Sequence, residues 1–365
     1  MPSYTSNGSQ GTFPERVVRV LIVDDSAYVR KVVAQMLSRS PFIEVVGSAH
    51  DGEEALEMVE SLHPDVVTLD LNMPRMDGVA FLKEQMARRP LPVVVVSIAG
   101  EGGEQALQAL DAGATDFVQK PTALATERVL EMADELVQKV KAASQVPLSR
   151  LPAPTRVPVA PSTAEKPARS PAMRQGQVDV VVIGISTGGP QGLRVLIPQL
   201  PADFPVPVAI VLHMPVGYTE LYAQKLDEIS PLRVSEGHEG DLLRPGQVMI
   251  APAGRHLTLR REPGGQVAAH LDARPFDTPH RPSVDVLFQS TADLYHERVL
   301  GVVMTGMGKD GLQGAAWIKS QNGLVFTEAE ETCVVYGMAR SVVEAGLSDK
   351  SVPLQRMANA ILEVV

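Results

Sequence analysis

The sequence has 365 residues and a formal net charge of −10, with 44% hydrophobic and 21% charged residues. These values predict a soluble protein of two globular domains, and the acidic balance argues against a general surface for nucleic acid or anionic membranes. The single cysteine, Cys333, excludes an intrachain disulfide and a cysteine-based metal cage. Residues 1–16 are predicted to be a flexible tail; their polar start has no apolar stretch, which argues against a signal peptide. No apolar run reaches membrane-spanning length, so we expect a cytoplasmic protein without direct membrane insertion.

The first part of the chain, residues 17–142, alternates predicted strands and helices. The strands are expected at 17–23, 43–48, 65–70, 93–97 and 116–119, and the helices at 27–38, 52–62, 78–88, 103–111 and 125–142. Repeated βα units imply a parallel sheet with helices on both faces, in which ligands bind at the carboxyl ends of the strands.

Polar residues stand at those carboxyl ends. Asp24 and Asp25 end the first strand, Asp70 the third, Ser97 the fourth and Lys120 the fifth. Converging carboxylates raise one another's pKa unless a hard cation such as Mg²⁺ compensates them. Such a cluster suits binding of a phosphoryl group, or its transfer to a carboxylate. The alternative is that the acids are helix N-caps, which explains one or two of them rather than the set.

Four motifs in order give residues 17–142 a resemblance to a response-regulator receiver domain, which has a flavodoxin-like fold. They are Val23-Asp24-Asp25-Ser26, residues 69–78 (LDLNMPRMDG), Val96-Ser97 and residues 116–121 (DFVQKP). The resemblance implies that Asp70 is the phosphoacceptor and that Ser97 and Lys120 sense the phosphoryl group. It also implies Mg²⁺ held by Asp24, Asp25, Asp70 and the backbone carbonyl of Asn72. Phe117 falls at the aromatic switch position, although a core phenylalanine explains it equally well.

Residues 143–177 are rich in proline, alanine, serine and threonine, which favours an extended, polyproline-like linker. Residues 178–365 then alternate again. Strands are expected at 180–185, 208–212, 232–236, 246–251, 298–305 and 323–327, a hairpin at 256–260 and 266–271, and helices at 191–199, 218–229, 283–295, 314–321, part of 334–344 and 354–365. This pattern predicts a second α/β sheet with a small antiparallel insert.

The run VVVIGISTGGPQGL at residues 180–193 predicts a strand, a tight turn and a helix start. Gly184-x-Ser186-x-Gly188 matches the nucleophile-elbow pattern, and amides at the helix start are suited to hold an oxyanion. The alternative is an ordinary glycine-rich turn with an N-cap serine. His213 and Asp310 also follow predicted strands, so a parallel sheet would bring nucleophile, base and orienting acid to one edge.

Other interpretations of the second half compete with this one. His280 is the second candidate for the base, and could instead line a substrate groove. Gly306-x-Gly308-x-x-Gly311 with Glu328 formally matches a dinucleotide fingerprint, which would make the protein a nucleotide-dependent oxidoreductase and leave Ser186 without a role. A third possibility is a non-catalytic binding module attached to the receiver.

Residues 179–365 resemble the catalytic domain of CheB-type chemotaxis methylesterases, the protein-glutamate methylesterase and glutamine deamidase family, with a Rossmann-like fold. The matching motifs are residues 184–190 (GISTGGP), 212–215 (LHMP), 250–256 (IAPAGRH), 280–288 (HRPSVDVLF) and 304–311 (MTGMGKDG). The resemblance implies that Ser186 is the nucleophile, His213 the general base and Asp310 its orienting partner. Thr187, Gly188 and the backbone amide of Met307 would support the oxyanion.

The two resemblances together imply a phosphorylation-regulated hydrolase. It would remove methyl groups from glutamate γ-methyl esters on chemoreceptors, releasing methanol, and would also deamidate receptor glutamines. The implied partners are a methylated chemoreceptor and a chemotaxis-type histidine kinase as phosphodonor, with no nucleic acid and no cofactor in the catalytic domain. The unphosphorylated receiver is expected to cover the edge that carries Ser186, and phosphorylation of Asp70 to loosen that contact.

Overall fold

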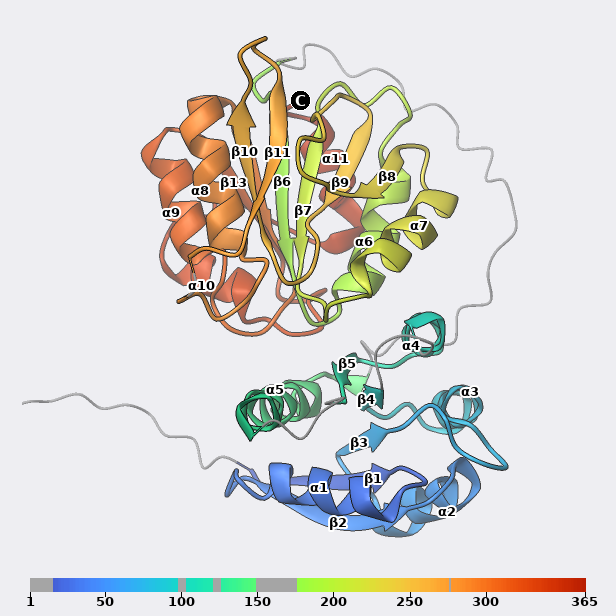
Figure 1. Ribbon diagram of the computed structural model, residues 1–365. Coiled ribbons are helices and arrows are strands. Elements are labelled where there is room, and N and C mark those ends of the chain that lie inside the picture. Colours follow the sequence, from blue (N-terminus) through green and yellow to red (C-terminus); the bar gives the residue numbers. More distant parts are fainter. Residues whose placement is uncertain (1–15, 98–102, 121–125, 149–175, 276) are drawn as a thin grey trace, which may run out of the picture.

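The computed structural model describes residues 16–97, 103–120, 126–148, 176–275 and 277–365. These residues form an N-terminal unit (16–148) around a five-stranded sheet and a C-terminal unit (176–365) around a seven-stranded sheet (Figure 1). None of the described helices is both long and apolar enough to cross a membrane.

The N-terminal unit is a parallel sheet in the order β2-β1-β3-β4-β5, which confirms the flavodoxin-like prediction. Its elements are β1 (Val18–Val23), α1 (Ala27–Leu37), β2 (Ile43–Ala49), α2 (Gly52–Leu62), β3 (Val66–Leu69), α3 (Gly78–Arg88), β4 (Val93–Ser97), α4 (Gly103–Asp111), β5 (Asp116–Gln119) and α5 (Thr126–Ser144). Valine-rich central strands are buried on both faces, as a covered parallel sheet requires. Helices α2, α3 and α4 cover one face, and α1 and α5 cover the other.

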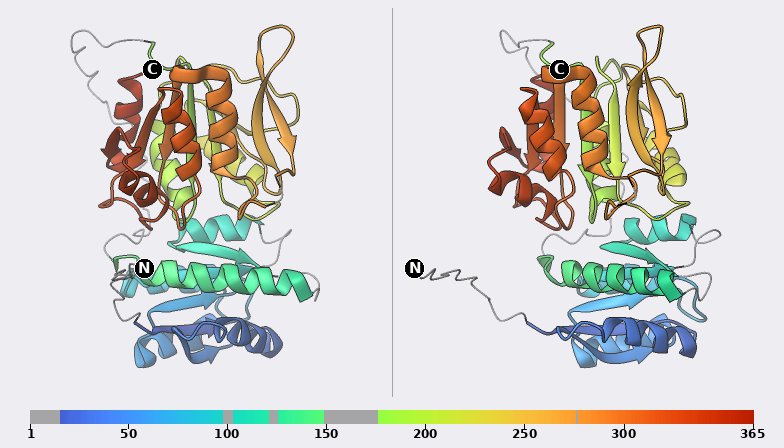
Figure 2. Two further views of the ribbon diagram at one scale, coloured as in Figure 1. Left: turned by 90° about the vertical axis from the view of Figure 1, so that its left-hand side faces the viewer. Right: turned by 60° about the vertical axis from the view of Figure 1, so that its left-hand side comes forward.

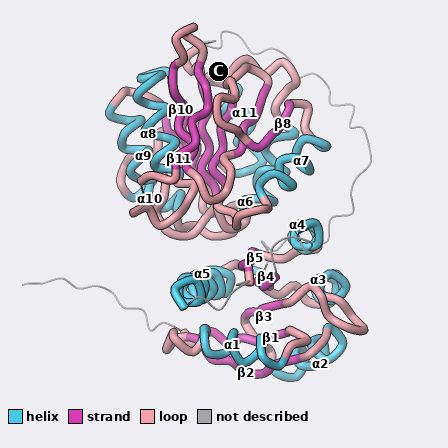
Figure 3. The backbone as a smooth tube through the Cα atoms, viewed as in Figure 1, coloured by secondary structure: helices cyan, strands magenta, loops and turns pink. Residues whose placement is uncertain are grey.

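The C-terminal unit has the strand order β14-β13-β12-β6-β7-β9-β8, and all its pairs are parallel. Its elements are β6 (Val180–Ile185), α6 (Gly189–Leu196), η2 (Ile197–Gln199), β7 (Val208–Leu212), α7 (Thr219–Ile229), β8 (Arg233–Glu236), β9 (Gln247–Ile250), β10 (His256–Arg261), β11 (Val267–Asp272), α8 (Val284–Tyr295), η3 (His296–Arg298), β12 (Val299–Val303), α9 (Leu312–Ser320), β13 (Leu324–Glu328), α10 (Met338–Glu344), β14 (Lys350–Val352) and α11 (Leu354–Leu362). Figure 3 shows the strands as a central layer between helices.

The two faces of this second sheet are covered differently. Helices α6, α7 and α11 pack on one face, while α8, α9, α10 and the hairpin β10–β11 pack on the other. The hairpin forms its own two-stranded antiparallel sheet, which confirms the predicted insert. The chain leaves the central strand β6 toward β7 on one side and later returns to β12 on its other side. The carboxyl ends of β6 and β12 are therefore a topological switch point, where α/β proteins commonly bind ligands.

The structure differs from the sequence-based prediction at α6 and β14. Helix α6 begins at Gly189 rather than Gln191, because Pro190 is tolerated in the first turn of a helix. The partial helix expected within 334–344 is present as α10, which begins at Met338. The short edge strand β14 was not predicted. Residues 1–15 of the predicted tail and residues 149–175 of the predicted linker lie outside the described residues.

Candidate active site

Ser186, His213 and Asp310 lie at one edge of the second sheet. They follow β6, β7 and β12, which are neighbours in the order β12-β6-β7. Backbone hydrogen bonds continue the ladder past the strand ends: the His213 N–H donates to the Ile185 carbonyl at 3.1 Å, and the Ser186 N–H donates to the Thr305 carbonyl at 2.9 Å. The sheet thus gathers the three side chains that the sequence analysis singled out, while their catalytic roles stay predictions.

His213 and Asp310 form a buried pair. Nε2 of His213 lies 2.9 Å from Oδ2 of Asp310, and the two side chains are only 9% and 7% exposed. Because an ionised carboxylate only accepts hydrogen bonds, Nε2 carries the proton and Nδ1 is the basic nitrogen of the neutral ring. Nδ1 is buried and has no hydrogen-bond partner among the described residues. The serine–histidine hydrogen bond is therefore not formed in this state, as is common before substrate binds.

The carboxylate of Asp310 is held by the start of helix α8. Its Oδ1 accepts from the Ser283 hydroxyl at 2.9 Å and the Asp285 N–H at 3.0 Å, and its Oδ2 accepts from the Val284 N–H at 2.8 Å. Burial alone raises the pKa of Asp310, but the hydrogen bonds from His213, Asp285 and Val284 outweigh it and hold that pKa below its usual value. Asp310 therefore stays ionised and fixes the His213 ring.

The turn that carries Ser186 depends on glycine. Gly188 has a φ of 78°, and a Cβ there would lie 2.5 Å from Val334. A Cβ on Gly306 would lie 2.7 Å from the Ser186 Cβ, so the Gly306 loop packs directly on the proposed nucleophile. Thr305 ties the two loops together: its hydroxyl donates to the Thr187 carbonyl at 2.9 Å and accepts from the Val335 N–H at 3.0 Å.

Two of the residues predicted to support the oxyanion lie in different surroundings. The half-buried Met307 lies in the loop beside Ser186, and its N–H donates to no carbonyl among the described residues. This leaves the amide available to an oxyanion. The Thr187 side chain is occupied: its hydroxyl donates to Oδ2 of Asp116, in the N-terminal unit, at 2.6 Å. The sequence analysis missed this contact.

His280 was the second candidate for the base, and Glu328 was the acid of the dinucleotide fingerprint; the structure shows the surroundings of both. The His280 ring stacks on His213 with ring centroids 4.1 Å apart, so it lines the site. Burial, and after it the electrostatic interaction with the His213 ring, lowers the pKa of His280 to about 4. Glu328 is fully buried, and its carboxylate accepts from the Thr305 N–H at 2.9 Å. A buried carboxylate used in this way does not bind a ribose, which removes the second element of the dinucleotide fingerprint.

The N-terminal unit lies against this edge through α4, β5 and α5 (Figures 1 and 2). Asp116 binds Thr187, and Gln191 Nε2 donates to the carbonyls of Ala114 at 3.0 Å and Leu110 at 3.3 Å. The Phe117 ring packs on Tyr218 with centroids 4.7 Å apart.

Beside Met307, residues from both units form a small apolar cluster: Ala142, Val146, Val334 and Val335. The interface between the two units therefore includes Thr187, which follows Ser186 in the sequence, and Met307 in the neighbouring loop.

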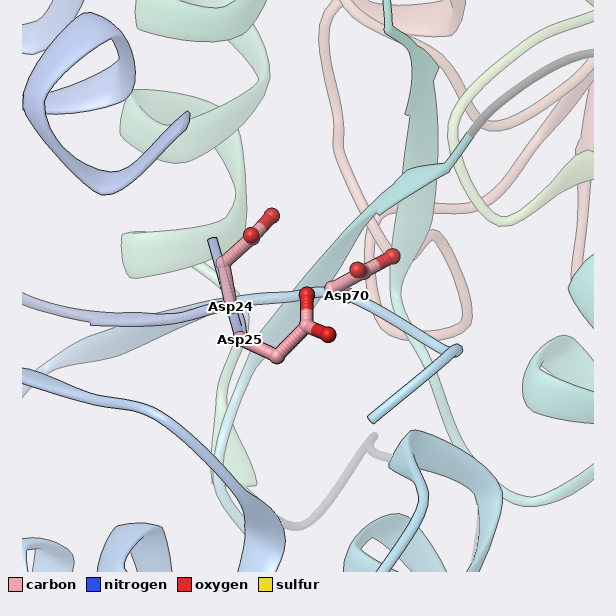
Figure 4. A group of neighbouring side chains, drawn as sticks. All are labelled: Asp24, Asp25 and Asp70. Atoms are coloured by element: carbon pink, nitrogen blue, oxygen red, sulfur yellow. The ribbon is translucent and has the colours of Figure 1, made fainter. Parts of the chain in front are cut away.

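The predicted acidic cluster is present at the carboxyl edge of the first sheet (Figure 4). Carboxylate oxygens of Asp24, Asp25 and Asp70 lie within 4.8 Å of one another. None of them is a helix N-cap, because Ser26, Asp51 and Asp77 cap α1, α2 and α3. The N-cap alternative is therefore wrong for this set.

The residues of this cluster fit a divalent cation and a phosphoryl group. Lys120 Nζ lies 2.7 Å from Asp24 and 2.8 Å from Asp70, but one ammonium does not balance three carboxylates. Burial raises the pKa of Asp70 above its usual value, against the opposing hydrogen bond from Lys120. The Ser97 hydroxyl is buried without a hydrogen-bond partner among the described residues, so an acceptor such as a phosphoryl oxygen would satisfy it. Asn72 is exposed in the loop after β3.

Sequence reasoning missed the residues that hold Asp310 and the contact that occupies Thr187. Ser283 and Asp285 stand in the motif at 280–288, yet nothing in their spacing indicates that they face Asp310. Asp116 was assigned to a strand and to the receiver motif at 116–121, without a role at the second domain.

Comparison with known proteins assigns a family to each part of the chain. A family model described as CheB methylesterase matches residues 181–361, and one described as response regulator receiver domain matches residues 20–133. The crystal structure of the Thermotoga maritima CheB methylesterase catalytic domain is 42% identical, covers 52% of this chain and 99% of its own, and superposes with a TM-score of 0.50.

Curated relatives match over nearly the whole length. Protein-glutamate methylesterase/protein-glutamine glutaminase 5 of Myxococcus xanthus is 49% identical over 341 residues, which is 93% of this chain and 96% of the relative. Protein-glutamate methylesterase/protein-glutamine glutaminase of Symbiobacterium thermophilum is 46% identical over 358 residues, which is 96% of this chain and 98% of the relative. The chain therefore belongs to the CheB methylesterase family and carries a response regulator receiver domain ahead of its methylesterase domain.

Proposed function

We propose that this protein hydrolyses γ-methyl esters of glutamate on chemoreceptors, releasing methanol, and deamidates receptor glutamines at the same site. The observation that carries the proposal is the buried His213–Asp310 pair, whose unpartnered Nδ1 lies at the same sheet edge as Ser186. The names of the curated relatives supply the substrate class. A receptor glutamate ester and a glutamine amide present the same acyl carbon to the nucleophile, so one site serves both.

In the proposed reaction, Nδ1 of His213 takes the proton of the Ser186 hydroxyl while its oxygen attacks the ester carbonyl. Asp310 stabilises the imidazolium through Nε2, and the Met307 amide with the start of α6 stabilises the oxyanion. His213 then protonates the departing methoxide, so methanol leaves and an acyl-serine remains. Water, deprotonated by His213, hydrolyses that acyl-serine to glutamate and restores the Ser186 hydroxyl. Ammonia leaves in place of methanol when the substrate is glutamine.

We further propose that the receiver domain controls access to Ser186. In the present arrangement Asp116 holds the Thr187 hydroxyl, and Ala142 and Val146 pack beside Met307. A receptor segment cannot occupy the same space, and this supports an inhibitory role for the unphosphorylated receiver. Asp70 would accept a phosphoryl group from a chemotaxis-type kinase, with Ser97 and Lys120 binding its oxygens. Mg²⁺, held by Asp24, Asp25, Asp70 and the Asn72 carbonyl, would neutralise the charge of that group.

The decisive experiment compares Ser186→Ala with the wild-type protein. Methanol release from a tritiated methyl ester of a chemoreceptor fragment is measured with and without a phosphodonor. Loss of the nucleophile should reduce turnover by at least about a thousandfold with an unchanged melting temperature. Ser320→Ala, which removes a surface hydroxyl from α9, is the matched control and should retain full activity.

Near-normal methanol release by Ser186→Ala would overturn the assignment of the nucleophile. A non-catalytic binding module, by contrast, would bind the receptor fragment but release no methanol even in the wild-type protein. Selective reaction of Ser186 with a serine-directed probe distinguishes the two functions, because a pure binding protein does not activate that hydroxyl.

A further inference from the structure

Two carboxylates at the start of α8 and α9 each bind the N-terminus of the other's helix. Asp310, which precedes α9, accepts from the Val284 and Asp285 amides of α8. Asp285, in the first turn of α8, accepts through Oδ1 from the Gly311 N–H at 2.9 Å and the Gly314 N–H at 2.7 Å, at the start of α9. Each helix thus satisfies otherwise unpaired amides with an acid from its neighbour.

This exchange requires the two helices to begin very close together. A Cβ on Gly314 would lie 2.5 Å from the Phe288 Cβ and 3.0 Å from the Asp285 Cα, so only glycine permits the approach. The Gly311 N–H links the two acids, because it donates to Asp285 at 2.9 Å and to its neighbour Asp310 at 3.1 Å. The backbone next to Asp310 is therefore fixed by the Asp285 carboxylate.

We propose that Asp285 is a positioning residue for the esterase reaction: by holding the Gly311 and Gly314 amides, it fixes the loop that presents Asp310 to His213. The inference rests on the proposed function, since it concerns the same reaction. Asp285 does not touch the reacting atoms. It acts through Asp310, whose distance and angle to Nε2 decide which nitrogen of His213 is basic.

The ionisation of Asp285 depends on the same contacts. Burial and the neighbouring Asp310 raise the pKa of Asp285 to about 6, while the amides of Gly311 and Gly314 favour its ionised form. Two carboxylates are tolerated side by side because each lies at a helix N-terminus, where partial positive charge stabilises an anion. A neutral side chain that still accepts hydrogen bonds should therefore preserve the geometry, whereas one that accepts none should not.

The test uses the full chain with Mg²⁺ and a phosphodonor, and measures kcat and KM for methanol release together with the melting temperature. Asp285→Ala should lower kcat by about 10- to 100-fold, because a misplacement of about 1 Å has effects of that size, while KM changes by less than about twofold. Asp285→Asn retains an oxygen for Gly311 and Gly314, and should recover kcat to within about threefold of wild type.

The matched control is Asp293→Ala. Asp293 also joins α8 to α9, by accepting from Trp317 Nε1 at 2.7 Å, but it lies near the other end of α8. Its loss should lower the melting temperature without changing kcat. As a spectroscopic check, the downfield proton resonance of the His213 Nε2–H should persist in Asp285→Asn and Asp293→Ala and shift or disappear in Asp285→Ala.

Wild-type kcat and an unchanged resonance in Asp285→Ala would overturn the positioning role and leave the proposed function standing. An equal loss of kcat in Asp285→Ala and Asp293→Ala would also overturn it, because general loosening of α8 and α9 would then explain the result. If the wild-type protein releases no methanol, the proposed function fails and the role of Asp285 in it fails as well.

Discussion

Replacing Asp116 with alanine removes the receiver carboxylate that binds Thr187, the residue next to the proposed nucleophile. Both residues are buried, with 9% and 4% of their surface exposed, and the hydroxyl donates to the carboxylate at 2.6 Å. Asp116 also accepts from Lys139 Nζ at 3.0 Å, in the receiver itself. Asp116→Ala should therefore weaken the inhibited arrangement and raise the basal rate of methanol release.

The size of the effect follows from the kind of hydrogen bond that is lost. A hydrogen bond to a charged group contributes about 1.5–3 kcal/mol, and about 1.4 kcal/mol corresponds to a factor of ten in an equilibrium constant. The equilibrium between covered and open forms should thus move by about 10- to 150-fold toward the open form. The basal rate should rise by the same factor, up to the rate of the phosphorylated wild-type enzyme.

The assay is methanol release without a phosphodonor, on full-length protein whose melting temperature and uptake of phosphate at Asp70 show a folded receiver. Glu104→Ala is the control: Glu104 also reaches the catalytic domain, but its side chain is 67% exposed and lies 4.0 Å from Lys225. Such a surface pair contributes about 0–1 kcal/mol, so the control should change the basal rate by less than about fivefold. An unchanged basal rate in Asp116→Ala would refute the inhibitory role of this contact.

Two further predictions concern phosphorylation and pH. Asp70→Asn should keep the basal rate of the wild type but lose its response to a phosphodonor, and chelation of Mg²⁺ should have the same effect; a phosphodonor response that survives the substitution would contradict the assignment of Asp70. The pKa of His280 is lowered from 6.5 to about 4, so the unfolded chain binds a proton that the folded protein does not bind between these values. The free energy of unfolding therefore carries no penalty from His280 above about pH 6.5, and it decreases as the pH falls from there toward about 4. His280→Gln should make the melting temperature less dependent on pH in that window, and identical pH profiles of the two proteins would contradict the prediction.

Much of the fold could be predicted because its parallel strands are short, valine-rich and separated by periodic helices. The exceptions have physical reasons. Strand β14 has three residues, two of them exposed, and exists only because it pairs with β13 at the sheet edge. Helix α6 includes Gly189 and Pro190, which as sequence indicate a turn but are compatible with a helix start.

The candidate site was predictable only in part. Strand ends on a parallel sheet brought Ser186, His213 and Asp310 to one edge, since the spacing of each from its strand is visible in the sequence. The role of Asp285 was not visible, because its partners are backbone amides that come within reach only when α8 and α9 pack. The contact between Thr187 and Asp116 joins residues 71 positions apart in two separate units, so no local pattern predicts it.

The position of Thr187 also has a consequence for how the sensitivity of this protein can evolve. Thr187 belongs to the nucleophile turn through its carbonyl and to the receiver contact through its hydroxyl. A mutation of Thr187 should therefore alter both the turnover of the open enzyme and the stability of the covered form. A mutation of Asp116, which lies outside the nucleophile turn, should alter only the stability of the covered form. Sequences that adapt to stronger or weaker stimuli should therefore differ at Asp116 rather than at Thr187. Substitutions at Asp116 change how much phosphorylation is needed for activation and leave the turnover of the open enzyme unchanged.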